Sequence, residues 1–138
     1  MAGTVVADTL QADSTSTLVL KNGVANTPPT IQDSAGTQIG TFCRAWVNFN
    51  GTGTVAIRAS FNVTSITDNG TGDYTVNFTT AMPDANYAPA FAGGVVGENW
   101  GLHLRSGTVP TTSAYRFQNV NTGPTATDVS FICLSFFR

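Results

Sequence analysis

Charged residues are scarce in this sequence, and their scarcity argues against several classes of protein. Asp, Glu, Lys and Arg together make up only 10% of the 138 residues, against roughly 25% in a typical soluble domain. The six cations are scattered along the chain without forming a basic run: Lys21, Arg44, Arg58, Arg105, Arg116 and Arg138. Nucleic-acid binding needs a concentrated positive surface, so we expect no nucleic-acid partner.

Long apolar runs are also missing. No stretch approaches the roughly 18 apolar residues that suggest a membrane-spanning helix, so we expect no membrane insertion. The first ten residues, MAGTVVADTL, lack the basic and apolar regions of a secretory signal peptide. The protein is therefore expected to be made in a cytoplasm and not exported by the general secretory route.

Residues that commonly carry catalysis or bind metal ions are few. His103 is the only histidine and Glu98 the only glutamate, and neither a GxSxG nucleophile motif nor a GxxxxGK[ST] phosphate loop occurs. Asp68, Asn69 and Asp73 lie close together, but the terminal glutamate of a calcium-binding EF-hand loop is absent there. We interpret this stretch as a tight turn and expect no catalytic residue, no metal ion and no cofactor.

Cysteine is limited to Cys43 and Cys133, which both fall in strand-like runs without a CxxC motif. Because no secretory signal is present, two buried reduced thiols are expected, in preference to a disulfide or a metal site. Neither cysteine is therefore a candidate site residue.

Short strand-like runs separated by glycine-rich turns dominate the later part of the chain. In residues 42–50 and 55–61, apolar and polar residues alternate with the two-residue period of a half-buried strand. Turn sequences at residues 50–53 and 68–73 separate these runs. About seven or eight short strands and no amphipathic helix predict an all-β fold, an antiparallel β-sandwich of jelly-roll-like type.

The first part of the chain has a different composition. Apolar residues are sparse there, and residues 22–40 are rich in Gly, Pro, Asn, Thr and Ser, which disfavours a helix. We expect residues 1–38 to form an extended arm or tether, and residues 39–138 to form the sandwich domain. Such an arm needs another surface to order it.

The last strand-like run, residues 128–138, has apolar side chains on both faces. Ile132, Leu134 and Phe136 share one face by alternation, and the opposite face is also largely apolar. A strand of this kind is expected to be buried on both sides, whereas only one side of a strand faces the core of a small sandwich. We therefore predict oligomerisation, with Ile132, Leu134 and Phe136 as candidate interface residues.

Aromatic side chains on an exposed face can stack on sugar rings. Trp100, in the sequence GENWG at the mouth of a predicted loop, and Tyr115 are the candidates for such a glycan contact. We favour burial in the core for both residues, because large aromatic side chains are common there.

Residues 45–89 read AWVNFNGTGTVAIRASFNVTSITDNGTGDYTVNFTTAMPDANYAP. This string resembles a module of tailed-bacteriophage virion proteins, often found at the distal end of tail fibres and tailspikes. The likeness extends over residues 42–138, and DNGTGDYTVNFTTAMPDANY is its most distinctive part. The resemblance implies a virion surface β-sandwich that forms a homotrimer around its last strand and has no enzymatic activity.

The resemblance leaves two functions open. A tail fibre needs a long shaft and a tail-attachment domain, whereas only residues 1–38 precede the sandwich here. If these residues are the whole protein, it is expected to be a capsid cement (decoration) protein. Such a protein lies on the outer capsid surface and stabilises the shell, with the major capsid protein as its partner. The alternative is a distal tail fibre or tailspike module that recognises a host-surface glycan.

Overall fold

The computed structural model describes residues 20, 29–93 and 101–138 of the chain. Within these residues the structure contains ten β-strands and no helix. Two four-stranded sheets account for most of the strands, and the remaining two form a separate hairpin. Every pair of neighbouring strands is antiparallel. The antiparallel all-β class expected from the sequence is therefore confirmed.

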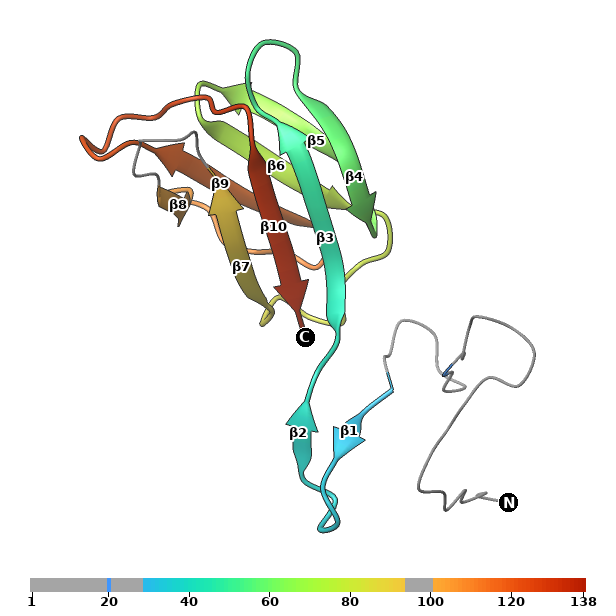
Figure 1. Ribbon diagram of the computed structural model, residues 1–138. Coiled ribbons are helices and arrows are strands. Elements are labelled where there is room, and N and C mark those ends of the chain that lie inside the picture. Colours follow the sequence, from blue (N-terminus) through green and yellow to red (C-terminus); the bar gives the residue numbers. More distant parts are fainter. Residues whose placement is uncertain (1–19, 21–28, 94–100) are drawn as a thin grey trace.

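The two four-stranded sheets lie one behind the other (Figure 1), and we name each after its two central strands. The β3–β10 sheet has the order β4 (Ala56–Phe61), β3 (Cys43–Asn50), β10 (Ile132–Phe137) and β7 (Ala88–Gly93). The β6–β9 sheet has the order β5 (Val63–Gly70), β6 (Asp73–Phe78), β9 (Ala114–Val120) and β8 (Gly101–Leu104).

Alternating side chains of the four central strands form the hydrophobic core between the sheets. These buried side chains are Ala45, Val47 and Phe49 of β3, Ile132, Leu134 and Phe136 of β10, Tyr74, Val76 and Phe78 of β6, and Tyr115 and Phe117 of β9. Their two-residue period follows from the pleat of a strand, which directs successive side chains to opposite faces. The two layers therefore have a sandwich-like arrangement.

Phe136 lies at the centre of an aromatic cluster that joins the two sheets. Its ring centroid is 5.0 Å from that of Phe78 and 5.4 Å from that of Tyr115, both on the opposite sheet. Tyr87, in the loop before β7, contacts it at 5.7 Å. All three contacts are edge-to-face, the geometry that the quadrupole of an aromatic ring favours.

The loops at the end where β3 finishes are joined through the buried side chain of Tyr74. Its hydroxyl oxygen lies 2.6 Å from Oδ1 of Asp128 and 2.8 Å from the carbonyl oxygen of Gly51. The backbone N–H of Gly72 donates to the same Asp128 oxygen at 2.7 Å. Burial, reinforced by the Asp128 carboxylate, raises the pKa of Tyr74, so the hydroxyl keeps its proton and can donate. A Cβ at Gly51 would lie 2.7 Å from this hydroxyl, which requires glycine there.

Asn62 forms the corner at which the chain leaves β4 in one sheet and enters β5 in the other. Its backbone φ is 56°, in the left-handed region that asparagine tolerates better than most residues. Its side-chain oxygen accepts the N–H of Thr80 at 2.7 Å. Its side-chain nitrogen donates to the carbonyl oxygens of Arg44 and Thr80, each at 3.0 Å. One asparagine side chain therefore links this corner to β3 and to the segment that follows β6.

The short hairpin precedes the sandwich and lies apart from it (Figure 1). It pairs β1 (Ile31–Gln32) with β2 (Gln38–Gly40). Asp33 closes the turn, because its Oδ1 accepts the N–H groups of Ala35 and Thr37, each at 2.9 Å.

This hairpin lies in the region that was predicted to be an extended arm or tether, residues 1–38. It also crosses the predicted boundary at residue 38, since β2 ends at Gly40. The turn chemistry of Asp33 and the positive φ of Gly36, 84°, explain why the chain reverses direction here. Residues 1–19 and 21–28 of the predicted arm lie outside the described residues.

Replacing Phe136 by alanine should destabilise the fold by about 3–5 kcal/mol, because it removes the ring at the centre of the core and leaves a cavity. Urea unfolding followed by circular dichroism measures this change. The control is Phe91→Ala on β7, since that ring is 53% exposed and its removal should cost much less. Equal losses in the two variants would contradict the placement of Phe136.

Candidate interaction surface

The outward face of the β6–β9 sheet is polar and internally hydrogen-bonded. The side-chain nitrogen of Asn77 donates to Oγ1 of Thr67 at 2.9 Å and to Oγ of Ser65 at 3.1 Å. That of Asn69 donates to Oγ1 of Thr75 at 2.9 Å. Such Thr and Asn ladders are typical of a sheet face in contact with water.

Asp73, Arg105 and Arg116 form a cluster of two ion pairs on the same face. The carboxylate of Asp73 accepts two hydrogen bonds from Arg116, at 2.8 and 2.9 Å, and one from Arg105 at 2.8 Å. Asp73 is only 7% exposed. The bidentate hydrogen bonds from Arg116 act against the cost of burial, and they lower the pKa of Asp73 with further help from Arg105. All charged groups of this cluster are mutually satisfied, which indicates a structural role.

The outward face of the β3–β10 sheet has the opposite character, and we call it the apolar face. One row of neighbouring residues across the four strands is Ala90, Ser135, Trp46 and Phe61. The next row is Ala92, Cys133, Asn48 and Ala59. The four strands of this sheet contain no Asp or Glu. The face therefore differs from its polar counterpart in both hydropathy and charge.

The apolar face divides into two halves of different shape. The small-residue half, on β7 and β10, presents Ala88, Ala90, Ala92, Cys133 and Ser135. The aromatic half, on β3 and β4, presents Trp46, which is 38% exposed, and Phe61, which is 55% exposed. A second protein surface can approach the backbone closely over the first half and can enclose large rings over the second.

Arg58 is held across the aromatic half by neighbouring groups. Its guanidinium donates to Oδ1 of Asn48 at 3.3 Å and to the carbonyl oxygen of Ser130. The same group lies 5.9 Å from the ring centroid of Phe131, within the range of a cation–π interaction. The charge is therefore fixed against the sheet and leaves the neighbouring apolar surface accessible.

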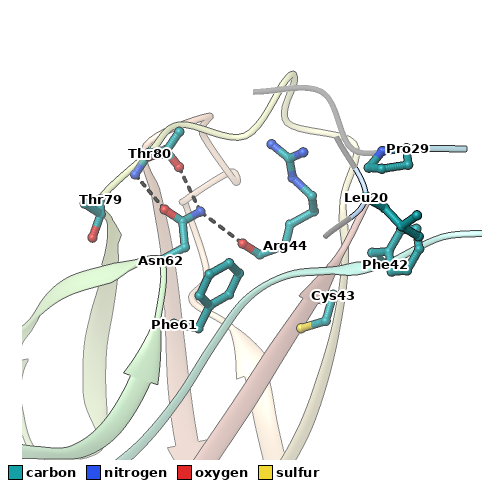
Figure 2. A pocket seen from close by; sticks show the side chains of 9 residues that line it. All are labelled: Leu20, Pro29, Phe42, Cys43, Arg44, Phe61, Asn62, Thr79 and Thr80. Carbon is teal, nitrogen blue, oxygen red and sulfur yellow. Dashed lines mark hydrogen bonds between the residues drawn. The ribbon is translucent and has the colours of Figure 1, made fainter. Parts of the chain in front are cut away.

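A shallow pocket of about 650 Å³ lies where β3 begins and β4 ends (Figure 2). Leu20, Pro29, Phe42 and Phe61 form its apolar walls. Its polar rim is formed by Asn62, Thr79 and Thr80, and Cys43 and Arg44 complete the lining. Leu20 lies beside Phe42 in this view, and both side chains are exposed.

The three residues predicted to form an oligomer interface are in the core instead. Ile132, Leu134 and Phe136 are at most 2% exposed, so their side chains cannot reach a partner chain. Alternation correctly placed them together on one face of β10, but the sequence did not show which face points inward. The outward side of the same strand carries Cys133, Ser135 and Phe137, which are half-buried.

The two candidates for a glycan contact, Trp100 and Tyr115, were expected in the core in preference to an exposed face. Tyr115 is 7% exposed and lies in the core, with its ring 5.4 Å from Phe136 and stacked 6.4 Å from Phe117. A core ring cannot stack on a sugar, so burial, the favoured interpretation, is confirmed for Tyr115. Trp100 lies outside the described residues.

Asp68 lies at a turn, as the sequence predicts. Oδ1 of Asp68 accepts the N–H of Gly70 at 2.9 Å, which confirms a tight turn. His103 is exposed on the outward face of β8. Cys43 and Cys133 are free thiols, half-buried where full burial was predicted.

Two features of these faces were missed by reasoning from the sequence. Asp73 pairs with Arg105, 32 positions away, and with Arg116, 43 positions away. No local sequence motif predicts contacts between residues so far apart. The alanine row of β7 reads as part of an apolar run, because Ala88, Ala90 and Ala92 alternate with Pro89 and Phe91. The outward direction of the alanines became evident only from their pairing with β10.

Among the described residues, no three His, Cys, Asp or Glu side chains are grouped so that they could hold a metal ion. The same part of the chain contains no helix long and apolar enough to cross a membrane. A scan against protein-family models finds no matching family, and searches of curated proteins and of solved structures find no match to this chain.

Replacing Asp73 by asparagine should cost about 2 kcal/mol of stability at pH 7, because two arginines lose a charged acceptor. The lowered pKa of Asp73 stabilises the fold above the unfolded-state value of about 3.9. That contribution is lost as the pH falls through the lower folded-state value. The stability difference between wild type and Asp73→Asn should therefore shrink below about pH 4.

Urea titrations between pH 7 and pH 2 measure this difference. Asp84→Asn serves as the control, because Asp84 also pairs with an arginine, Arg138, but is more exposed. Its effect at pH 7 should be the smaller of the two. A difference for Asp73→Asn that stays constant down to pH 2 would contradict the role assigned to its charge.

Proposed function

We propose that this chain is a capsid cement (decoration) protein of a tailed bacteriophage, which binds the outer surface of the shell and stabilises it. In this proposal the sandwich is jelly-roll-like and forms a homotrimer, and its partners are its own copies and the major capsid protein. The role is structural and involves no catalysis, cofactor, nucleic acid or membrane insertion. The resemblance of residues 42–138 to virion proteins supports the proposal.

The apolar face is the observation that carries the proposal. It combines exposed aromatic rings with strands that hold no carboxylate. Soluble monomers rarely expose large contiguous apolar patches, and charged residues are depleted at the centre of protein interfaces. This face is therefore suited to burial against another protein, while the polar face of the β6–β9 sheet is suited to solvent.

The two halves of the apolar face suit a cyclic assembly. A trimer with three-fold symmetry uses two different patches on each copy, because its contacts run head to tail. The small-residue half of one copy can approach closely the aromatic half of the next, where Trp46 supplies a large ring. The last strand then contributes through Cys133 and Ser135, in place of the buried Ile132, Leu134 and Phe136.

A trimer strengthens binding to a shell without adding new kinds of contact. Once one copy is bound, the other two are held near their own sites at a high effective concentration. Neighbouring capsid subunits would in this way be clamped together. The low charge of the chain, 10% of its residues, suits a protein that buries much of its surface, since charge is costly to desolvate.

A second function has support from the pocket beside Phe42 and Phe61. Its apolar walls and polar Asn62, Thr79 and Thr80 rim combine features that sugar-binding sites use. A distal tail fibre or tailspike module that recognises a host glycan is the alternative proposal. The two functions differ in the number of copies that a virion carries.

Replacing Ser135 by arginine should shift the trimer toward monomer, because it introduces a cation at the centre of the apolar face. Analytical ultracentrifugation measures the mass of wild type and variant at several concentrations. The matched control is Ser65→Arg on the polar face, which should remain trimeric. Dissociation in both variants, or in neither, would contradict the proposed interface.

The virion copy number separates cement protein from tail module. Quantitative mass spectrometry of purified particles should find this chain in amounts comparable with the major capsid protein. Immunogold labelling should place it over the head of the particle. A few copies per virion, labelled at the tail tip, would reject the cement proposal in favour of the alternative.

A further inference from the structure

Two arginines share one carboxylate on the polar face of the β6–β9 sheet. Oδ2 of Asp73 accepts a hydrogen bond from Nε of Arg105 at 2.8 Å and one from Nη2 of Arg116 at 2.9 Å. Oδ1 accepts one from Nε of Arg116 at 2.8 Å. Because both guanidinium groups bind the same carboxylate, they are held side by side. A single negative charge meets two positive charges there, so one positive charge is left over.

Several guanidinium donors remain after Asp73 has taken its hydrogen bonds. Nη1 and Nη2 of Arg105 and Nη1 of Arg116 have no hydrogen-bond partner in the described part of the chain. The two arginine side chains are 36% and 38% exposed, so these donors are accessible from solvent. A guanidinium holds its N–H groups in a planar fork that matches the oxygens of an anion. The pair therefore has the charge and the donors of an anion-binding site.

The neighbouring side chains leave this position open. His103 and Gln118 lie in one row with Asp73 across the strands, and neither side chain has a hydrogen bond to another described residue. The ring of His103 lies over Gly101, where an added Cβ would meet Nε2 at 2.8 Å. It therefore leans along β8 away from Arg105. The amide of Gln118 is free to donate to a ligand and to accept from it.

No second carboxylate competes for the arginines on this face. Asp68 is the other acidic residue of these four strands, and it is paired with Tyr74, whose side chain lies in the core. The positions beside the arginines are polar and uncharged, since Thr75 is paired with Arg116 and Thr67 follows in the same row. An anion bound here would therefore have hydroxyl and amide groups around it.

We propose that Arg105 and Arg116 form a binding site for the carboxylate of an acidic saccharide. The carboxylate binds the free end of the Arg105 fork and Nη1 of Arg116, and the saccharide hydroxyls exchange hydrogen bonds with Thr75 and Gln118. These hydroxyl and amide groups suit a polyhydroxylated ligand, whereas a peptide is recognised through pockets for its side chains. A nucleic acid needs a wider positive surface than two arginines provide.

This inference goes beyond the proposed function, because it requires neither a trimer nor a capsid. The site is on the polar face, which stays in contact with water when the apolar face is buried. It is also separate from the pocket beside Phe42 and Phe61, on which the alternative function depends. Its failure would leave the outcome of the Ser135→Arg experiment unchanged.

An NMR titration of the full chain with trigalacturonic acid tests the inference. The acid should bind, and its methyl ester should not, because the ester keeps the hydroxyls and loses the charges. Arg105→Gln should weaken binding about tenfold, since charged hydrogen bonds are lost while the bidentate pair of Arg116 and Asp73 is retained. The matched control is Arg138→Gln, which removes another half-exposed cation and should bind like the wild type.

The shifts of the wild type itself locate the site without any substitution, and they should concentrate on residues 101–105 and 114–118. Shifts centred elsewhere would overturn the inference. So would equal weakening in Arg105→Gln and Arg138→Gln, because attraction by net charge alone would then explain the binding. Equally tight binding of the methyl ester, or of a blocked peptide of three glutamates, would refute recognition of an acidic saccharide.

Discussion

The burial of Phe136 among Phe78, Tyr87 and Tyr115 decides which side of β10 faces the core. Because side chains alternate along a strand, a shift of one residue would bring Cys133, Ser135 and Phe137 inside and turn the large apolar side chains outward. The aromatic cluster makes that shift unfavourable, since it would lose three edge-to-face contacts and the burial of several rings. The character of the outward face of the β3–β10 sheet therefore follows from the packing on its inner side.

The two outward faces differ in the number of polar groups that they offer to water. On the β6–β9 sheet, Thr, Asn, Arg and Asp side chains satisfy one another, and even the buried carboxylate of Asp73 has three hydrogen bonds. On the β3–β10 sheet, Ala, Cys, Phe and Trp side chains leave little for water to bind, and Arg58 is already held by Asn48 and Ser130. A protein with one hydrated face and one apolar face is suited to a position at the surface of a larger assembly.

The sequence predicted the features that depend on local periodicity. It could not predict those that depend on the packing of strands that are distant in the sequence. Alternation in residues 42–50 and 55–61 correctly predicted antiparallel strands, and Asp68 was correctly assigned to a turn. The same alternation grouped Ile132, Leu134 and Phe136 on one face but could not show that this face is the core, because both faces of β10 are apolar. The sequence could not show which groups bury Tyr115, because they lie on β6 and β10, which are distant in the sequence. The hairpin before the sandwich was missed because the prediction weighed composition there and not the turn chemistry of Asp33.

The central claim is that the apolar face is buried when this protein assembles, and hydroxyl-radical footprinting tests it directly. The modification of Trp46 and Phe61 would be compared with that of His103, on the polar face, in dilute and in concentrated protein. The account predicts that Trp46 and Phe61 become protected as the concentration rises, while His103 reacts equally throughout. Equal modification of both faces at every concentration would contradict it.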